Sequence, residues 1–284
     1  MLASAPTMPD SDDNLRFDRF IDRITLTPGE LLLARRAAQN VAAILRAALQ
    51  PGADERADHL VVGSIGKRTA IRPLSTVDLV YLLPDPGLVQ DGLAQIDRIL
   101  RHGMPGIIPL ATEQGLIVPL GDWSVFVLVG IDRPRGFAFW TSNGWIDSHP
   151  AAEITALRLS DSLSGGRTTR LLILLKAWAV ADRATLPSFA LEILAREFMS
   201  EHGGSVWPAI LSDFFAWVRQ KDTSMIQRPG SSLPLIVAQS WQKQAEAAYW
   251  RCVLAKRLAG ESDPLAELAE WQRLLGPAFG HQDE

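Results

Sequence analysis

A single acidic residue inside an apolar strand is the feature that most restricts what this 284-residue chain can fold into. Residues 61 to 84 read VVGSIGKRTAIRPLSTVDLVYLLP, with a Gly-Ser pair, a basic link and then the run TVDLVYLL. The Val, Leu and Tyr residues predict a β-strand, in which Thr76 and Asp78 share one face. A carboxylate there predicts a phosphate-transfer site or the remnant of one. The plain alternative is a structural acid bonded to an arginine or to a helix N-terminus.

The rest of the chain divides into a mixed N-terminal part and a helical C-terminal part. The sequence TPGE at 27–30 predicts a capping box that opens a long helix. The segment GLIVPLGDWSVFVLVGI predicts a hairpin that turns at Gly121-Asp122. From about residue 150 the apolar spacing predicts successive helices. We expect a disordered tail over 1–14, an α/β core over 15–150 and a helical domain over 151–278.

Composition and charge narrow the class of protein. The net charge of −4 argues against a strongly basic nucleic-acid binder, so we do not expect nucleic acid among the ligands. The single cysteine, Cys252, excludes a disulfide framework within the chain and favours a reducing compartment. The apolar runs are too short to span a bilayer, and the N-terminus lacks a secretory pattern. We therefore expect a soluble, cytoplasmic protein with no membrane partner.

The Gly-Ser segment fails two familiar phosphate-binding patterns. A Walker loop needs a glycine at position 61 and Ser or Thr at position 68, where this chain has Val61 and Arg68. A dinucleotide fingerprint needs a third glycine that opens a helix, whereas Thr69-Ala70-Ile71 run toward the next strand. The five histidines show no metal-binding spacing, and the chain has no Gly-x-Ser-x-Gly nucleophile elbow.

A different template fits the segment. Its order and spacing resemble the nucleotidyltransferases related to DNA polymerase β, and most closely the CD-NTases, the cGAS-like and oligoadenylate-synthetase-like branch. The matching residues are Gly63, Ser64, Thr69, Ile71, Ser75, Asp78 and Leu79. Downstream, GWIDSHP (144–150) and LLILLKAWAVADRATLPSFALEIL (171–194) also resemble family segments. The resemblance implies a polymerase-β-like nucleotidyltransferase core with a mixed β-sheet, followed by an all-helical domain.

The resemblance also implies a nucleotide site, with a cleft between the core and the helical domain. Its Gly-Ser turn would approach the triphosphate, its lysine would add positive charge, and its aromatic residue would stack on the base. Taken singly, Lys176 is expected to be a solvated helix residue, Ser188 an ordinary first residue of a helix and Phe189 a core residue. The resemblance assigns nucleotide binding to Gly63, Ser64, Thr69, Lys176, Ser188 and Phe189.

Family members hold two Mg²⁺ ions with three acids, two alternating on one strand and one on a neighbouring strand. In this chain Thr76 stands at the first acid position and Asp78 at the second. Counting along the segment SVFVLVGI places Val127 at the third, and neither Asp122 nor Asp132 falls in register. We therefore expect Asp78 to be the sole retained catalytic and metal-binding acid. Any Mg²⁺ or Mn²⁺ would be held weakly.

Three functions follow in order of preference. The first is a degenerate CD-NTase homologue, a pseudoenzyme that binds an NTP or a cyclic oligonucleotide. With a protein partner or as a homo-oligomer, it would act in anti-phage second-messenger signalling. The second is an active enzyme that makes linear or cyclic oligonucleotides from NTPs, with an acid supplied by a partner or an unrecognised loop. The third is an interaction module that no longer binds nucleotides. The missing acids favour the first over the second, and the phosphate-side residues favour the first over the third.

Overall fold

The long helix α2 (Pro28–Leu49) begins at the capping box that the sequence predicts. Thr27 Oγ1 accepts the N–H of Glu30 at 3.3 Å, and the Glu30 carboxylate accepts the N–H of Thr27 at 2.7 Å. The same carboxylate binds two N–H groups of Arg72, in the link before the acid-bearing strand. The computed structural model describes residues 10–52, 58–74, 76–84, 92–141, 144–203 and 206–281.

The chain forms two compact units. The sheet unit comprises Leu26–Ala156 and Pro229–Ser231, and the helical unit comprises the residues up to Thr25, Leu157–Arg228 and the residues from Ser232 onward. The first helix, α1 (Asp10–Ile24), thus groups with the helical unit and not with the α/β core in which we placed residues from 15 onward. It also includes residues 10–14 of the expected tail, whose residues 1–9 lie outside the described part.

Within the described residues, a seven-stranded mixed sheet has the order β1-β2-β5-β4-β3, with β6 paired to β5 and β7 to β6. Strands β2 and β5 run parallel, and the other neighbours run antiparallel. The predicted fold class and the predicted hairpin at Gly121-Asp122 are both confirmed. The strands are β1 (His59–Val61), β2 (Thr76–Leu82), β3 (Leu110–Ala111), β4 (Gly115–Leu120), β5 (Trp123–Arg133), β6 (Gly136–Thr141) and β7 (Gly144–Ser148).

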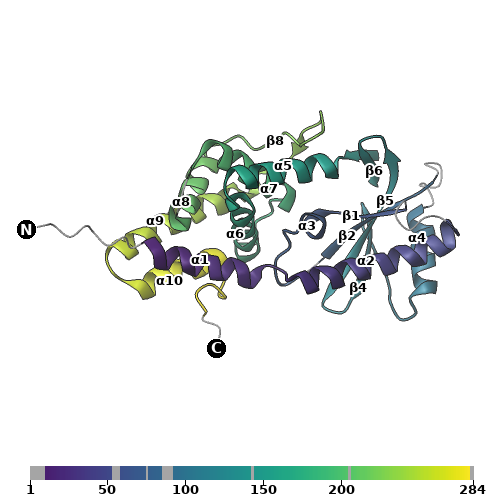
Figure 1. Ribbon diagram of the computed structural model, residues 1–284, viewed down its shortest axis with the longest axis horizontal. Helices are drawn as coiled ribbons and strands as arrows, with labels where there is room; N and C mark the ends of the chain where they lie inside the picture. The colour runs from purple at the N-terminus through teal and green to yellow at the C-terminus, as the bar shows by residue number, and fades with distance from the viewer. Residues whose placement is uncertain are drawn as a thin grey trace, which may run out of the picture. The chain divides into compact units, whose positions relative to one another are not determined.

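Helices cover one face of this sheet. Helix α2 packs on β2 and β5, α4 (Gly92–Gly103) packs on β4, and the two helices contact each other (Figure 1). The core beneath them takes alternate residues of the two parallel strands, which are Val77, Leu79, Tyr81, Val125, Val127 and Val129. Because successive side chains of a strand point to opposite faces, the intervening residues lie on the other face. Those residues include Thr76, Asp78, Ser124 and Phe126.

Short elements differ most from the sequence prediction. Residues Gly63–Lys67, which we expected to be a polar link, form the short helix α3. Its two glycines disfavour a helix, but Gly66 donates to the carbonyl of Val62 at 3.1 Å and packs so closely on Val61 that a Cβ would lie 2.7 Å from its oxygen. A small ribbon of β8 (Met225–Ile226) and β9 (Leu235–Ile236) also interrupts the predicted helical half.

The helical unit is arranged around α6 (Arg167–Ala181). Every residue from Leu171 to Trp178 is buried, which is typical of a helix surrounded by others. Elsewhere in the unit, Phe17 of α1 packs on Trp271 and Phe279, with ring centroids 5.1 and 4.8 Å away. The remaining elements are α5 (Pro150–Leu163, which begins in the sheet unit), α7 (Ser188–Glu201), α8 (Trp207–Val218), η2 (Gln239–Trp241), α9 (Gln242–Gly260) and α10 (Pro264–Leu275).

The capping box should make stability depend on pH. Hydrogen bonds from Thr27, and next from Arg72, lower the pKa of Glu30 from 4.5 to about 2. A carboxylate whose pKa is lower in the folded state stabilises the fold above its unfolded pKa, and this contribution is lost here between about pH 4.5 and about pH 2. We expect Glu30→Gln to lower the thermal unfolding midpoint at pH 6 by at most a few degrees, because the group is exposed. The difference should shrink through that window, and a pH-independent difference would contradict this account.

Candidate functional site

Asp78 stands on the sheet face opposite α2 and α4. In the parallel ladder Asp78 is paired with Phe126 and Thr76 with Ser124, and the hydroxyls of Thr76 and Ser124 lie 3.4 Å apart. All four residues are half-buried, as expected for side chains that line an open depression. The immediate neighbours of the acid on this face therefore carry hydroxyl and aromatic groups instead of carboxylates. The motif residue Ser75 lies outside the described residues.

The Gly-Ser turn lies directly against the Asp78 carboxylate. The N–H of Val62 donates to the backbone oxygen of Asp78 at 3.0 Å, and Gly63, which begins α3, has a φ of +59°. A Cβ on Gly63 would lie only 2.0 Å from Asp78 Oδ2. Glycine is thus required both by the left-handed backbone and by the close approach of the acid. Ser64, the next residue, is half-buried.

Two other polar residues of this segment hold the loop in place. Thr69 is 1% exposed, and its N–H donates to the carbonyl of Ser64 at 2.8 Å. The backbone N–H of Thr69 thus closes the turn, and the assignment of this residue to nucleotide binding stays a prediction. Lys67 Nζ lies 2.8 Å from a carboxylate oxygen of Glu153 in α5, and both side chains are largely buried. The charge of this lysine is thus offset within the sheet unit.

Val127 does not stand at the third acid position, contrary to the count along its strand. It pairs with Leu79, is fully buried and belongs to the core under α2. A shift of one residue along a strand moves a side chain to the opposite face. Ser124, Phe126 and Leu128 are the β5 residues nearest Asp78 on its face, and none of them is acidic. Asp132 has the same parity but lies near the end of β5, where it pairs with Phe137, so no carboxylate of β5 lies beside Asp78.

A pocket of about 560 Å³ opens on this face. One side of it is the turn between β3 and β4, where the Thr112 hydroxyl donates to the carbonyl of Gly115 at 3.0 Å and accepts the N–H groups of Gln114 and Gly115. This turn brings in Glu113, which the sequence reasoning missed because nothing in Thr-Glu-Gln-Gly distinguishes it from an ordinary turn charge. The lining residues are Thr76, Asp78, Thr112, Glu113, Gln114, Ile117 and Phe126.

The residues of this pocket do not fit a two-metal centre. Mg²⁺ takes oxygen ligands in a near-octahedral arrangement, and two ions require several carboxylate oxygens between them. The carboxylates here are Asp78 and the exposed Glu113, while Phe126 places a ring beside the acid. Across the part of the chain that the structure describes, no three His, Cys, Asp or Glu side chains form a group able to hold a metal ion.

The other predicted nucleotide-binding residues lie on the helical unit. Lys176 belongs to the central helix α6 and is 8% exposed. Ser188 is the first residue of α7, which confirms the predicted helix start after Pro187, and its side chain is exposed. Phe189, the next residue, is half-buried. The first turn of α7 therefore presents backbone N–H groups beside an exposed hydroxyl, a combination that suits an anion.

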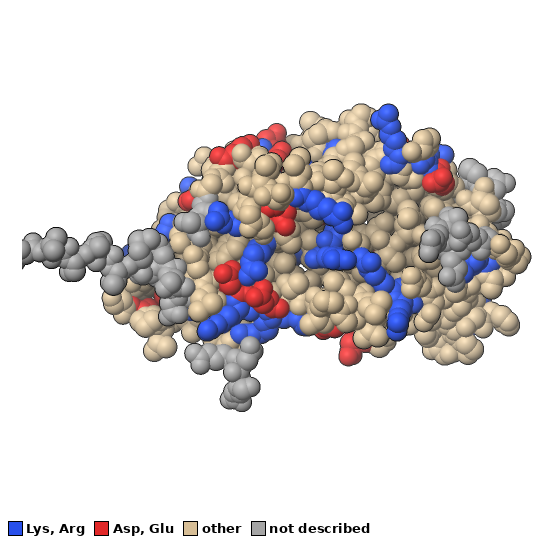
Figure 2. Space-filling model, viewed as in Figure 1, with Lys and Arg blue, Asp and Glu red and all other residues tan. Residues whose placement is uncertain are grey.

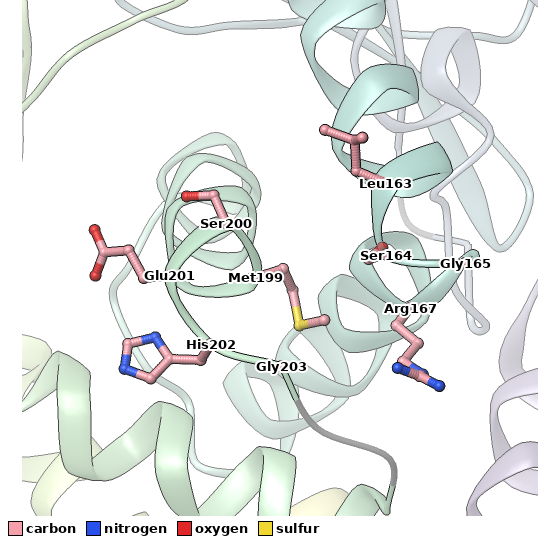
Figure 3. A pocket seen from close by; sticks show the side chains of 9 residues that line it. All are labelled: Leu163, Ser164, Gly165, Arg167, Met199, Ser200, Glu201, His202 and Gly203. Carbon is pink, nitrogen blue, oxygen red and sulfur yellow. The ribbon is translucent and has the colours of Figure 1, made fainter.

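A second pocket, of about 400 Å³, lies where α5, α6 and α7 end or begin (Figure 3). His202 stacks on Phe198 with ring centroids 4.5 Å apart, and Glu201 accepts the indole N–H of Trp217 at 3.1 Å. In Figure 3 Met199 extends toward the space between the helix ends, whereas Glu201 points away from it. Because its charged side chains do not converge, we place the candidate site on the sheet unit.

The face drawn in Figure 2 carries both basic and acidic side chains. Figure 2 shows Lys and Arg side chains interspersed with Asp and Glu side chains on the visible face, in keeping with the net charge of −4. No helix among the described residues combines the length and the apolar character needed to cross a bilayer.

The acid-bearing strand lies beside the Gly-Ser turn in a mixed sheet that helices follow, which is the arrangement of a nucleotidyltransferase-like fold. Solved structures identify the particular version as the CD-NTase fold, which confirms the resemblance at the level of the fold. No family model and no curated protein sequence matches the chain. The assignment therefore depends on three-dimensional likeness.

Three solved structures illustrate that likeness. CdnC of E. coli MS115-1 in complex with HORMA-deltaN is 17% identical with a TM-score of 0.72, and the match covers 95% of this chain and 99% of that chain. The structure of E. coli MS115-1 CdnC with ATP is 16% identical with a TM-score of 0.70, and the match covers 95% of this chain and 99% of that chain. The Vibrio cholerae cyclic AMP-GMP synthase DncV, bound to the linear intermediate pppA(3',5')pG, is 12% identical with a TM-score of 0.74, covering 95% and 98%.

Gly63→Ala should destabilise the protein more than the matched variant Gly121→Ala. Both glycines have positive φ, +59° and +75°, so each alanine carries left-handed strain of about 1–2 kcal/mol. A Cβ at Gly121 meets nothing within 4 Å, whereas at Gly63 it would collide with the Asp78 carboxylate. We expect Gly63→Ala to lose at least ~1 kcal/mol more of unfolding free energy in denaturant titrations. Equal losses would mean that Asp78 moves aside without penalty.

Restoring acids on the correct face should restore metal binding. The double variant Thr76→Asp with Phe126→Asp would put three carboxylates side by side, and we expect its affinity for Mn²⁺ to rise at least about tenfold in calorimetry. In the matched control, Thr76→Asp with Val127→Asp, the second new acid would be buried in the core, and we expect the protein to unfold instead. A folded control variant that binds Mn²⁺ more tightly than the Phe126 variant would overturn the register given above.

Proposed function

We propose that this chain is a CD-NTase-fold protein that binds nucleotides but lacks a working two-metal centre. The observation that carries this proposal is the identity of the residues around Asp78, where Thr76 and Phe126 share its face and neither is acidic. Losing one preorganised electrostatic group typically lowers a rate by about 10² to 10³, so nucleotidyl transfer would be very slow. The phosphate-side residues do not depend on the missing acids, and they are Gly63, Ser64, Lys176 and Ser188.

Structures with the same fold support this choice of ligands. CdnC has been solved with ATP and with HORMA-deltaN, and DncV with GTP. For this chain we propose the same classes, namely an NTP or cyclic oligonucleotide as the small ligand and a protein or a second copy as the partner. In that role the chain would be a sensor or scaffold in anti-phage second-messenger signalling, a setting that comes from the resemblance alone.

A second candidate function is a slow synthase that makes oligonucleotides from NTPs. The observation in its favour is Glu113, which lines the same pocket as Asp78 and comes from a loop outside the expected motif. Two carboxylates and the phosphates of a substrate can supply ligands for one divalent cation, whereas the family reaction uses two. Glu113→Gln would then remove the activity.

An activity assay and a binding assay separate these functions. Labelled ATP, GTP, CTP and UTP with Mg²⁺ or Mn²⁺ should give no oligonucleotide above background, while calorimetry should detect binding of ATP or GTP. Robust synthesis that disappears in Glu113→Gln would replace the first function with the second. Flat titrations for every NTP and cyclic dinucleotide would favour an interaction module.

Variants of two lysines test the phosphate-binding role on the helical unit. Lys176→Met keeps most of the length of the side chain and removes its charge, and we expect it to weaken ATP binding about tenfold. Lys243→Met on α9 is the matched control, because Lys243 is exposed on the same unit and has no role in the proposed site. Equal affinities for the two variants would remove Lys176 from the site.

A further inference from the structure

A groove of about 650 Å³ lies between α2 and α4, the two helices that cover the sheet face opposite Asp78. Helix α2 lines it with Ile44, Ala47 and Ala48, which are three and four residues apart and therefore lie on one side of the helix. Both alanines are exposed, so the groove opens to solvent. Its volume is that of an ordinary small-molecule site.

Helix α4 forms the other wall and lies close to α2. A Cβ on Gly103 would come within 2.4 Å of Ile44 Cγ2, so glycine at this position allows the two helices to touch at this end of the groove. Ile99 is half-buried and lines the same wall. The two isoleucines and the alanines of α2 thus give the groove an apolar floor. An apolar ligand that lies on this floor gains free energy in proportion to the area that it removes from water.

The polar side chains that line the groove all come from α4, and all of them can donate N–H groups. They are Gln95, Arg98 and His102, spaced by three and four residues, so they lie along one side of the helix. Asp97, which is adjacent to Arg98, pairs with Arg101 at 2.7 Å outside the groove. Among the described residues that line the groove, none is Asp or Glu. The groove therefore favours an anion over a cation.

We propose that this groove binds a small amphipathic carboxylate, that is, a molecule with one carboxylate and an apolar body, such as a medium-chain fatty acid. The Arg98 guanidinium would bind the carboxylate through two parallel N–H groups, which match its planar geometry, and Gln95 and His102 would be further donors. The apolar body would cover Ile44 and Ile99. The described lining includes none of the residues assigned to nucleotide binding, so the inference goes beyond the proposed function.

The dimensions of the groove favour a small molecule over a protein partner. Its lining on α4 runs from Gln95 to Gly103, about 12 Å along the helix axis, which is close to the extended length of an acid of about eight carbon atoms. An ordinary protein interface engages about 20 to 30 residues on each side, whereas the described lining comprises eight residues. Octanoate is therefore a probe that fits the groove.

Calorimetry with octanoate and 1-octanol tests the inference. Octanoate should bind saturably to the unsubstituted protein, and 1-octanol, which has an apolar chain of the same length without the charge, should bind at least about tenfold more weakly. Arg98→Met should weaken octanoate binding at least about tenfold. Arg36→Met is the matched control, because Arg36 is exposed on α2 about three turns before Ala47, outside the described lining. Its octanoate affinity should equal that of the unsubstituted protein.

A second variant tests the apolar part of the groove. Ala48→Phe would fill the groove from an exposed position of α2, and we expect it to weaken octanoate binding at least about fivefold because apolar contact area is lost. The thermal unfolding midpoint of this variant should change by at most a few degrees, because the substitution lies outside the core. A folded Ala48→Phe variant with unchanged octanoate affinity would contradict the position of the apolar body.

The outcomes separate this inference from the proposed function. Flat octanoate titrations, equal affinity for 1-octanol, or equal effects of Arg98→Met and Arg36→Met would each overturn the inference, and flat titrations would leave the groove to a protein partner. The comparison of octanoate with 1-octanol uses the unsubstituted protein, so it holds even if a variant fails to fold. ATP binding without octanoate binding would overturn this inference alone. Octanoate binding without any NTP binding would support the groove and remove the triphosphate site.

Discussion

The parallel pairing of β2 with β5 determines which side chains meet at the candidate site. Its register pairs Asp78 with Phe126 and Leu79 with Val127. The valine and leucine are buried under α2, so a slip of one residue would carry Asp78 into the core and turn Val127 outward. The burial of apolar residues on one face of the sheet therefore determines which side chains share the opposite face. These are one acid, two hydroxyl groups and an aromatic ring.

The same surface shows why a shared fold does not by itself establish a shared activity. The chain shares its fold with CdnC and DncV at 12–17% identity. A fold alone does not determine a function, which depends on the groups at the site. Here the Gly-Ser turn and one acid remain in contact, while Thr76 and Phe126 stand beside that acid.

The structural features that the sequence predicted correctly are those that residues close together in the chain determine. The capping box at Thr27 and the hairpin at Gly121 are determined by neighbouring residues, and both are confirmed. The face of Val127 was predicted wrongly because the register of β5 depends on its pairing with β2. Glu113 was missed because the order β2-β5-β4-β3, which brings its turn to the acid, is a tertiary property. The unit to which α1 belongs depends on contacts between Phe17 and residues near the other chain end.

The β3–β4 turn has an evolutionary consequence. Its conformation is fixed by the Thr112 hydroxyl and by the backbone of Gly115, whereas the side chain of Glu113 is exposed and takes no part in either. Exchanges at that position should leave folding almost untouched, unlike exchanges on the neighbouring central strands. Selection can therefore change the acidity of this rim across generations while the architecture persists.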